Sequence, residues 1–355
     1  MLNLIDKKSP PLADDPQFQL SCRQLSADDE QQIIQLLATI YGDTYSYDAF
    51  YKPGVIANLL RQEKLTSYGE FINGNELIAQ TGFWHKDPKQ DYVEAGFAMR
   101  LPTQTKHYEA THVQQLWFEI IKHFRKSHHY IHLNCTTLHP FAQRYISHFI
   151  NAKPCGLILN YAADEKIRGI AATQNNMHAL IMTAVLDKET IGRQHCYLPT
   201  AWFSWFQSIY QNLGLDRELI AIEPASPSAA YQLALIEENR AIDMTRHKLI
   251  AIDPNPAIQQ PEISDQDTRL IHLPLNDPHL ITTVFNQLIA DGYQPVGLRP
   301  QQNRADEMIL QAIQHKQNTI NNLSNEMKLA SRFSRELIFA WQVLCQSAPT
   351  GSISK

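Results

Sequence analysis

The sequence predicts a mixed α/β fold that is organised as two similar halves. Patterns typical of strands and helices alternate over residues 18–165, and strands that bracket helices in this way imply a mixed sheet covered on both faces. The dipeptide Asn73-Gly74 lies between two apolar runs, which is the strongest short-range signal for a β-hairpin. The motif Ile131-His132-Leu133 recurs 140 residues later as Ile271-His272-Leu273, and His139 recurs as His279, which indicates a duplicated domain.

The composition excludes several classes of protein. The 355 residues are enough for about two domains, and the net charge of −5 argues against nucleic acid as the main partner. No apolar run reaches the roughly 18 residues of a membrane helix, and the first residues lack the apolar core of a secretion signal. The five cysteines are odd in number and never occur as CxxC, which is typical of free thiols in a reducing compartment. We therefore expect a cytoplasmic protein with no membrane partner.

The first half contains a continuous series of expected elements. Residues 1–17 lack periodicity and are expected to be a flexible lead-in, after which Ser26 is expected to cap a helix with Asp28, Asp29 and Glu30 in its first turn. We expect the first domain to cover residues 18–165. Its other elements are a strand at Gln17–Leu25, a helix at Pro53–Glu63, strands at Ser67–Ile72, Glu76–His85 and Asp91–Met99, a helix at Glu109–Lys126, a strand at Tyr130–Cys135, a helix from His139-Pro140 and a strand at Cys155–Tyr161.

The second half repeats part of this series over residues 166–315. It begins with a strand pair, Ala179–Val185 and Gln194–Leu198, and continues with a helix at Thr200–Leu213. Further strands are expected at Leu219–Glu223, His247–Ile252 and Gln294–Arg299. Residues 253–267 are rich in Pro, Gln and Asp and replace the helix of the first half, so the two copies are not equivalent.

One long helix is expected from Gln314 onward, within a C-terminal segment at 316–346. Apolar residues follow a heptad spacing along it from Ile320 to Leu344, including Leu337 and Trp341. Two interpretations remain open. The stripe either docks on its own domain or forms the contact of a homodimer.

Several short motifs, taken in their order along the chain, resemble the GNAT acyltransferase superfamily and within it a long two-domain subgroup. The resemblance rests on Tyr41–Pro53, Val93-Glu94-Ala95-Gly96, His139-Pro140-Phe141-Ala142-Gln143, Tyr197-Leu198-Pro199, Ile209–Leu215 and Gly292–Gly297. It implies tandem GNAT-like domains, the second one degenerate. It also implies acetyl-CoA as co-substrate, without a metal, and a small-molecule amine as acceptor.

The resemblance also assigns residues to the acyl donor. The backbone of the fourth strand, here Phe97, Ala98 and Met99, would pair with the pantetheine arm. The loop with Thr105, Lys106, His107, Tyr108 and Ala110 would surround the pyrophosphate. This loop departs from the family pattern of R/Q-x-x-G-x-G/A, because Thr105 replaces the Arg or Gln, Tyr108 replaces the first Gly, and Glu109 adds a carboxylate. A degenerate loop predicts weak binding of CoA.

Three residues are candidates for catalysis. Glu94 lies in a strand expected to place it beside Tyr92, Gly96 and Ala98, with Phe97 and Met99 on the other face, and it can take a proton from an ammonium group. His139 would orient substrate or relay a proton. Tyr145 lies one residue from the position at which relatives carry a thiolate-protonating tyrosine, a position that Ile146 holds here. The alternatives are a structural carboxylate for Glu94 and a helix-capping role for His139.

Aromatic residues gather between the first two helices, and Tyr41, Tyr45 and Tyr51 are the candidates for contact with the acceptor. Core packing is the alternative for them. The histidines at 123, 128, 129 and 132 lack the spacing of a metal site, so we predict no metal. The leading interpretation is N-acyl transfer from acetyl-CoA, or another acyl-CoA, to a small primary amine. The alternative is a catalytically inactive protein that keeps the fold for binding or regulation.

Overall fold

The computed structural model describes residues 20–45, 47–85, 89–101, 110–161, 177–226, 230–239, 244–253, 268–313, 323 and 327–347, and these fall into two compact units. The first unit holds the described residues up to 85 and those at 94–126, and the second holds the others. The boundary differs from the predicted division at residue 165, because the segment from Ser127 onward packs with the C-terminal part of the chain. The assignment of residues 18–165 and 166–315 to separate GNAT-like domains stays a prediction.

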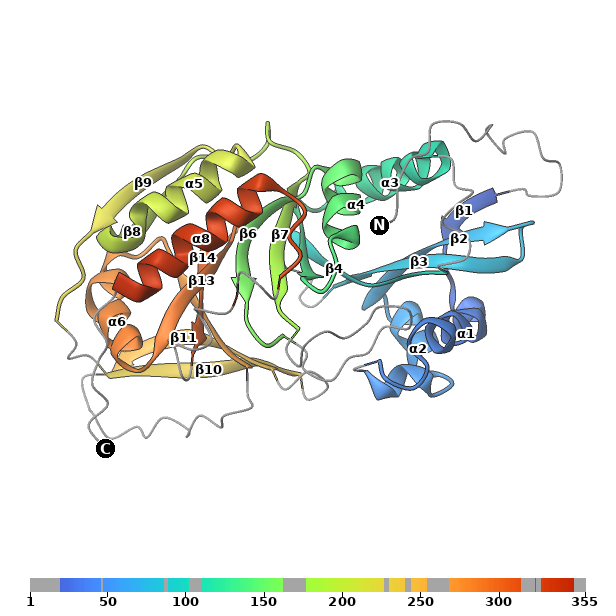
Figure 1. Cartoon of the computed structure of the whole chain (residues 1–355), viewed down its shortest axis with the longest axis horizontal. Helices are drawn as coiled ribbons and strands as arrows, with labels where there is room; N and C mark the ends of the chain where they lie inside the picture. The colour runs from blue at the N-terminus through green and yellow to red at the C-terminus, as the bar shows by residue number, and fades with distance from the viewer. Residues whose placement is uncertain are drawn as a thin grey trace. The chain divides into compact units, whose positions relative to one another are not determined.

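The first unit is an antiparallel sheet with helices on both faces. The sheet order is β1 (Leu20–Gln24), β2 (Leu65–Ile72), β3 (Glu76–Trp84) and β4 (Tyr92–Arg100), whose first two residues belong to the second unit. Helices α1 (Glu30–Tyr41) and α2 (Val55–Arg61) cover one face, and α3 (Ala110–Phe124) covers the other (Figure 1). The predicted hairpin is confirmed, since Asn73 and Gly74 both have positive φ, as a type I′ turn requires.

A 3-10 turn at Ala27–Asp29 leads into α1, and it is capped by the residues that the sequence indicates. The Ser26 hydroxyl accepts a hydrogen bond from the Asp28 backbone N–H at 3.3 Å, and the Asp29 carboxylate accepts one from the Ser26 backbone N–H at 2.8 Å. Arg23 donates to the same carboxylate at 2.7 Å, and this contact lowers the pKa of Asp29. The apolar face of α1, from Ile33 to Ile40, is buried against the sheet.

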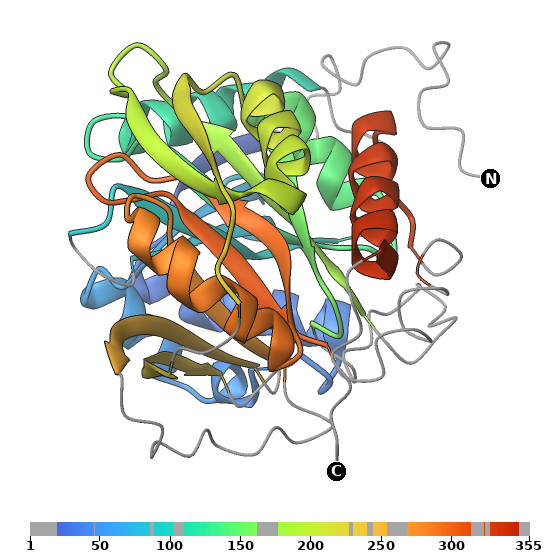
Figure 2. The ribbon, with the colours of Figure 1, turned by 90° about the vertical axis from the view of Figure 1, so that its left-hand side faces the viewer.

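The second unit contains a mixed sheet with an internal repeat. Its order is β5-β7-β6-β13-β14-β12-β11-β10. The strands of this sheet are β5 (Tyr130–Thr136), β6 (Lys153–Ile158), β7 (Ala179–Val185), β10 (Ala230–Asn239), β11 (Met244–Asp253), β12 (Thr268–Pro274), β13 (Tyr293–Arg299) and β14 (Glu307–Ala312). β10 and β11 form one edge of the sheet (Figure 2).

The repeat is visible in the connectivity. In the first copy the chain runs through β5, α4 (Phe141–Ile150), β6 and β7, and the order in the sheet is β5-β7-β6. In the second copy the chain runs through β12, α6 (Pro278–Ala290), β13 and β14, and the order in the sheet is β12-β14-β13. The two copies meet at one register pair, Gly156 opposite Gly297. β11 pairs with β12 in parallel as far as His272. This arrangement is consistent with the predicted duplication.

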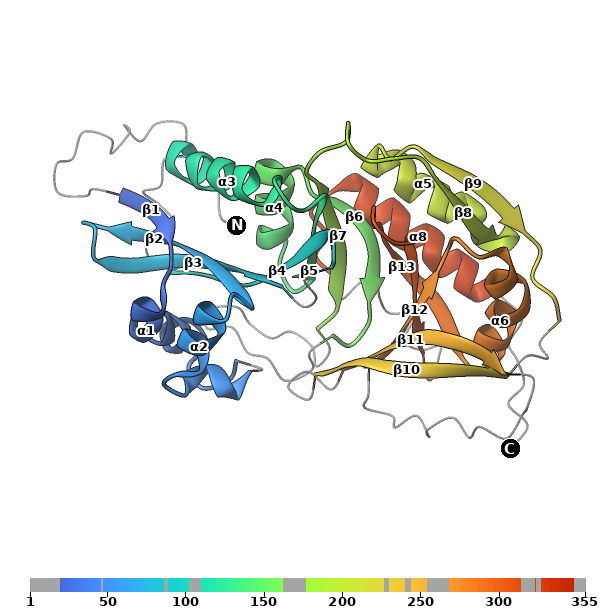
Figure 3. The same ribbon diagram turned by 180° about the vertical axis from the view of Figure 1, so that it is seen from behind.

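One predicted pairing is wrong. Ala179–Val185 does not pair with Gln194–Leu198: β7 lies between β5 and β6, whereas β8 (Gln194–Pro199) pairs in parallel with β9 (Arg217–Ile222) through α5 (Phe203–Leu213), as Figure 3 shows. The parallel pair is the expected outcome of a strand-helix-strand unit. The strands β10 and β14 were not predicted.

The predicted long helix is also wrong in part. Residues 327–331 are not helical, and the last helix, α8, spans Arg332–Ser347. Its Trp341 indole N–H donates to the Pro295 carbonyl at 2.6 Å, and the Trp205 indole N–H donates to the Leu337 carbonyl at 3.0 Å. Both Leu337 and Trp341 are buried. These contacts favour docking of the stripe on its own unit, and a homodimer through this helix stays a prediction.

Candidate functional site

Strand β4 contains a β-bulge at the residues predicted to hold the pantetheine arm. Gly96 lies opposite Gly82 and Met99 lies opposite Gln80, so Phe97 and Ala98 together face a single residue of β3. Phe97 has φ 53°, in the left-handed region that non-glycine residues rarely adopt. The Gln80 side-chain amide donates to the Phe97 carbonyl at 2.8 Å, and its oxygen accepts from the Ser67 hydroxyl at 3.0 Å. The local distortion of β4 is therefore held by buried hydrogen bonds.

The predicted orientation of Glu94 relative to Phe97 is wrong, because the strand between them is bulged. Residues directly opposite each other in an antiparallel pair share a face, and Glu94 lies opposite Trp84. Trp84 stacks on Phe50 at 5.8 Å between ring centroids, and Phe50 lies 4.7 Å from the Phe97 ring. Glu94 therefore shares its face with Phe97, whereas strict alternation along the strand predicted opposite faces. The extra residue of the bulge is the physical reason.

Aromatic side chains cover this face of the sheet. The Tyr45 ring lies 4.8 Å from Tyr41 and 5.7 Å from Phe97, and the Tyr51 hydroxyl accepts a hydrogen bond from the Tyr45 backbone N–H at 3.2 Å. Tyr45 and Phe50 are buried, whereas Tyr41 and Tyr51 are half-buried. Tyr45 thus packs in the core, and the exposed parts of Tyr41 and Tyr51 remain candidates for acceptor contact.

The segment that carries these tyrosines is anchored to both helices beside it. The Glu30 carboxylate accepts hydrogen bonds from the Gly54 N–H at 2.7 Å and the Ala57 N–H at 2.8 Å. Because these two donors lie at the N-terminus of α2, the carboxylate of α1 satisfies groups that would lack an intrahelical partner. The aromatic cluster is therefore held between two fixed helix ends.

The second unit holds His139 and Tyr145. His139 precedes α4 and is half-buried, and desolvation together with the nearby positive charge of Lys328 lowers its pKa. Its imidazole is therefore neutral at pH 7, a form that can accept a proton. Tyr145 lies on α4 with its ring 4.7 Å from Phe149, and Ile146 beside it is buried in the core.

A short segment near the C-terminus crosses the start of α4. The Gln143 side-chain amide donates to the carbonyls of Thr136 at 2.9 Å and Lys328 at 3.1 Å, and its oxygen accepts from the Ala330 N–H at 2.9 Å. The Lys328 N–H donates to the Thr137 carbonyl at 2.8 Å. Gln143 thus ties residues 328–330 to the end of β5, and it reaches His139 through the backbone carbonyl at 3.5 Å.

Thr105, Lys106, His107 and Tyr108 of the predicted pyrophosphate loop lie outside the described residues. Ala110 is the first residue of α3, and Phe97, Ala98 and Met99 lie in β4. Ala98 is exposed, whereas Phe97 and Met99 are buried. The structure brings Glu94 and the tyrosines onto one face of the first unit, while His139 and Tyr145 belong to the second.

Several residues that shape this site were not predicted. Ser67 and Gln80 hold the bulge, and a glutamine in the middle of an apolar strand is a signal that could have revealed them. Lys328 and Ala330 carry no local signal, because their contacts to α4 join residues far apart in the sequence.

Two of the cysteines, Cys135 and Cys155, are buried in strands of the second unit. Burial raises the pKa of Cys135 and Cys155 to about 12, so both thiols stay protonated and behave as small apolar side chains. Within the described residues, no group of three His, Cys, Asp or Glu side chains is arranged to hold a metal ion. None of the described helices combines the length and apolar character needed to cross a bilayer.

Comparison with known proteins finds solved structures that resemble part of this chain. No family model matches the chain, and no curated protein matches it in sequence. Spermidine N-acetyltransferase from Vibrio cholerae, solved with CoA and spermine, is 14% identical over 47% of this chain and 96% of its own, with a TM-score of 0.36. A GNAT-family acetyltransferase from Streptococcus pneumoniae is 11% identical over 47% of this chain and 99% of its own, with a TM-score of 0.38.

Proposed function

We propose that the chain is an N-acyltransferase that moves an acyl group from acyl-CoA to a small primary amine. One observation carries the proposal: β4 has a bulge at Phe97 and Ala98, and Glu94 lies on the face of this strand that the aromatic cluster covers. A bulge twists a strand and leaves part of its backbone unpaired, which makes room for an extended amide-bearing ligand. The element order of residues 20–158, as predicted from the sequence, supports the same proposal.

The reaction needs a base, an acyl donor and a route for the leaving group. Glu94 takes a proton from the ammonium form of the acceptor, whose free amine then attacks the thioester carbonyl carbon. A C–N bond forms, the C–S bond breaks, and the thiolate of CoA leaves. Tyr145 is the residue we assign to proton delivery at the sulfur, and His139 keeps the role of orienting substrate or relaying a proton. Tyr41 and Tyr51 provide aromatic surface and hydroxyl groups for the acceptor, and acetyl-CoA is the expected donor.

A catalytically inactive binding or regulatory protein is the second candidate. The sequence of the predicted pyrophosphate loop favours it, because Tyr108 replaces a glycine and Glu109 adds a negative charge near the phosphates. Both candidate functions use the same fold, but only the first predicts turnover of acyl-CoA.

Release of CoA from acetyl-CoA distinguishes the two candidates. The full chain is mixed with acetyl-CoA and a panel of polyamines, amino acids and aminoglycosides, and the free thiol is measured with time. We expect one class of amine to raise the rate of thiol release above that of buffer and of protein without amine. If acetyl-CoA binds and no amine in the panel accelerates release, the second candidate replaces the first.

Restoring the family pattern of the loop should tighten the binding of CoA. A charge-assisted hydrogen bond contributes about 1.5–3 kcal/mol, so two recovered contacts correspond to about 100-fold or more in affinity. We expect the variant Thr105→Arg with Tyr108→Gly to show this gain over a parent that binds in the high micromolar range or more weakly, measured by calorimetry with acetyl-CoA.

The matched control for the loop is Gln104→Arg, which adds the same charge one residue earlier and should change affinity by less than about threefold. Tight binding by the unmodified chain would contradict the prediction and would direct attention to Lys106 and His107. An equal gain in both variants would assign the effect to general charge.

A further inference from the structure

A buried glutamine of β3 binds the backbone of the bulge in β4. Gln80 and its neighbour Ser67 in β2 are almost fully buried, and both belong to the first unit. The Gln80 side-chain nitrogen donates to the Phe97 carbonyl at 2.8 Å, and the Gln80 side-chain oxygen accepts from the Ser67 hydroxyl at 3.0 Å. Because both ends of the amide have a partner, its orientation is fixed.

An amide is a costly side chain at this position of the strand. Gln80 lies opposite Met99, whose side chain, like that of Phe97, belongs to the apolar core of the first unit. A buried amide loses its hydrogen bonds to water, whereas an apolar side chain of similar volume carries no such cost. Phe97 itself has φ 53°, which is unfavourable for a residue with a Cβ atom. A strained backbone that a buried polar group holds in place is more typical of a binding site than of a sheet core.

The hydrogen bond from Gln80 also sets the direction of one peptide group of β4. A trans peptide group carries its C=O and its N–H on opposite sides, and the described part of the chain has no cis peptide bond. Since the Phe97 carbonyl points to the Gln80 amide, the Ala98 N–H of the same peptide group points away from it. Ala98 is exposed, and the register pairs described for β3 and β4 pass over both Phe97 and Ala98. One N–H donor is thus held in a fixed direction outside this ladder.

We propose that Gln80 is a positioning residue for the acyl donor: it holds the peptide group between Phe97 and Ala98 so that the Ala98 N–H donates a hydrogen bond to a carbonyl oxygen of acyl-CoA. This role rests on the acyl transfer proposed above. Two kinds of oxygen in the donor have the required chemistry, an amide oxygen of the pantetheine arm and the thioester oxygen. A hydrogen bond to the arm lowers KM, whereas one to the thioester oxygen, which gains charge during attack by the amine, raises kcat.

Gln80→Met tests the role directly, because methionine keeps the approximate volume of glutamine and removes the donor to Phe97. Initial rates are measured with varied acetyl-CoA and the most active amine of the panel, and calorimetry with CoA and acetyl-CoA gives the same comparison without turnover. We expect kcat/KM for acetyl-CoA to fall at least about tenfold per folded molecule, while KM for the amine changes by less than about twofold. A rise in KM and in the Kd of CoA assigns the arm amide, and a fall in kcat alone assigns the thioester oxygen.

Ser67→Ala is a milder second variant. It removes the hydroxyl that holds the far end of the Gln80 amide and leaves the donor to Phe97 in place. We expect a loss of about threefold in kcat/KM for acetyl-CoA, in the same kinetic constant that changes in Gln80→Met.

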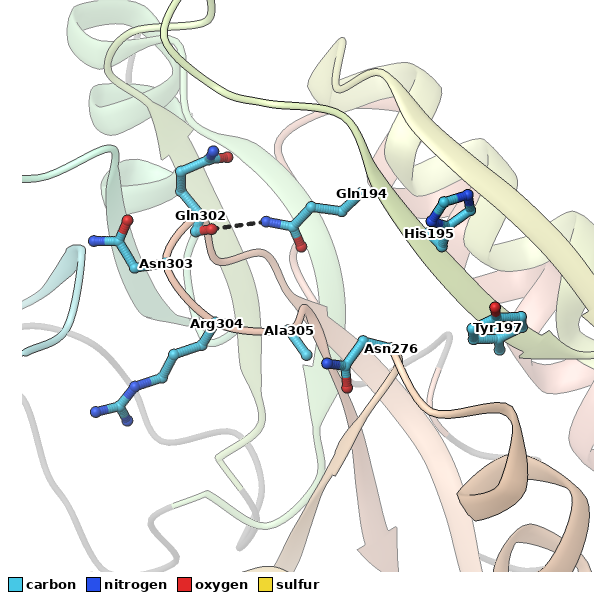
Figure 4. A pocket seen from close by; sticks show the side chains of 8 residues that line it. All are labelled: Gln194, His195, Tyr197, Asn276, Gln302, Asn303, Arg304 and Ala305. Atoms are coloured by element: carbon cyan, nitrogen blue, oxygen red, sulfur yellow. Dashed lines mark hydrogen bonds between the residues drawn. The ribbon is translucent and has the colours of Figure 1, made fainter.

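Gln194→Met is the matched control, since it makes the same substitution at another glutamine that donates to backbone carbonyls. The Gln194 amide donates to the Gln301 carbonyl at 3.1 Å and to the Gln302 carbonyl at 2.8 Å, the second of which is drawn in Figure 4. Gln194 lies in the second unit and lines a polar groove of about 400 Å³ that contains no residue assigned to acyl transfer. We expect this variant to lose stability and to keep the kinetic constants of the parent chain within about twofold.

The outcomes separate the role of Gln80 from acyl transfer itself. Unchanged constants for acetyl-CoA in both Gln80→Met and Ser67→Ala, equal losses in Gln80→Met and Gln194→Met, or a change confined to the amine would overturn the role of Gln80 and leave acyl transfer standing. If the parent chain neither binds acetyl-CoA nor releases CoA with any amine, acyl transfer fails and the role of Gln80 fails with it.

Discussion

Replacing Glu94 by glutamine should lower the turnover of the chain by about 10²–10⁴, the usual contribution of a positioned general base. The side chain projects from β4 opposite Trp84, on the face that also carries Phe97 and the aromatic cluster. Glutamine has nearly the same shape and keeps one oxygen, so packing changes little while the ability to take a proton is lost. We expect the melting temperature to stay within about 2 °C of that of the parent chain.

The measurement combines initial rates with thermal unfolding. In the parent chain kcat/KM should rise with pH along an acid limb that reports the ionisation of the base, and this limb should disappear in Glu94→Gln. The control is Glu76→Gln, which removes an exposed carboxylate from β3 of the same unit and should leave the rate unchanged. Loss of stability with an unchanged rate per folded molecule would instead make Glu94 a structural carboxylate.

The corrected orientation of Glu94 shows where prediction from sequence reaches its limit. The meander of β2, β3 and β4 could be predicted, because alternation and the Asn73-Gly74 turn are local signals. The bulge at Phe97 has no such signal, because the residue with positive φ is not a glycine and its conformation depends on the distant Gln80. A one-residue insertion is enough to move every later side chain to the other face.

Pairing between distant strands was the second limit. β7 is buried at nearly every position, which is typical of a central strand covered on both faces, and it pairs with both β5 and β6. Proximity in the sequence suggested β8 as its partner instead. The contact of α8 with Pro295 and the contact of Gln143 with Lys328 also join residues far apart in the chain, so no local sequence pattern predicts them.

A second sign of the duplication is present in the sequence. Pro154-Cys155-Gly156-Leu157 in β6 recurs as Pro295-Val296-Gly297-Leu298 in β13. Both strands have a register irregularity between the proline and the glycine, and the two glycines face each other where the copies meet. Glycine is required there for close approach of two backbones, which local propensity does not describe.

Alanine at Gly156 should be among the most destabilising single changes in the second unit. A Cβ atom at this position would lie 2.2 Å from the Val296 carbonyl oxygen and 2.4 Å from the Gly297 Cα atom. Both are backbone atoms of β13, so relief requires the two strands to separate rather than one side chain to rotate. We expect the free energy of unfolding to fall by at least about 3 kcal/mol, at the upper end for overpacking of a core.

Gly297→Ala is the matched comparison for Gly156→Ala, because it adds the same methyl group from the other strand. Its Cβ would meet the end of the Ile181 side chain at 2.5 Å, while the nearest backbone atom, the Cys155 carbonyl oxygen, is 3.3 Å away. A terminal methyl group can move by a change of rotamer, so we expect a loss of about 1–2 kcal/mol. Urea unfolding followed by circular dichroism measures both variants. If the two losses are equal, or if Gly156→Ala is as stable as the parent chain, the backbones of β6 and β13 are not in the close contact that joins the two copies.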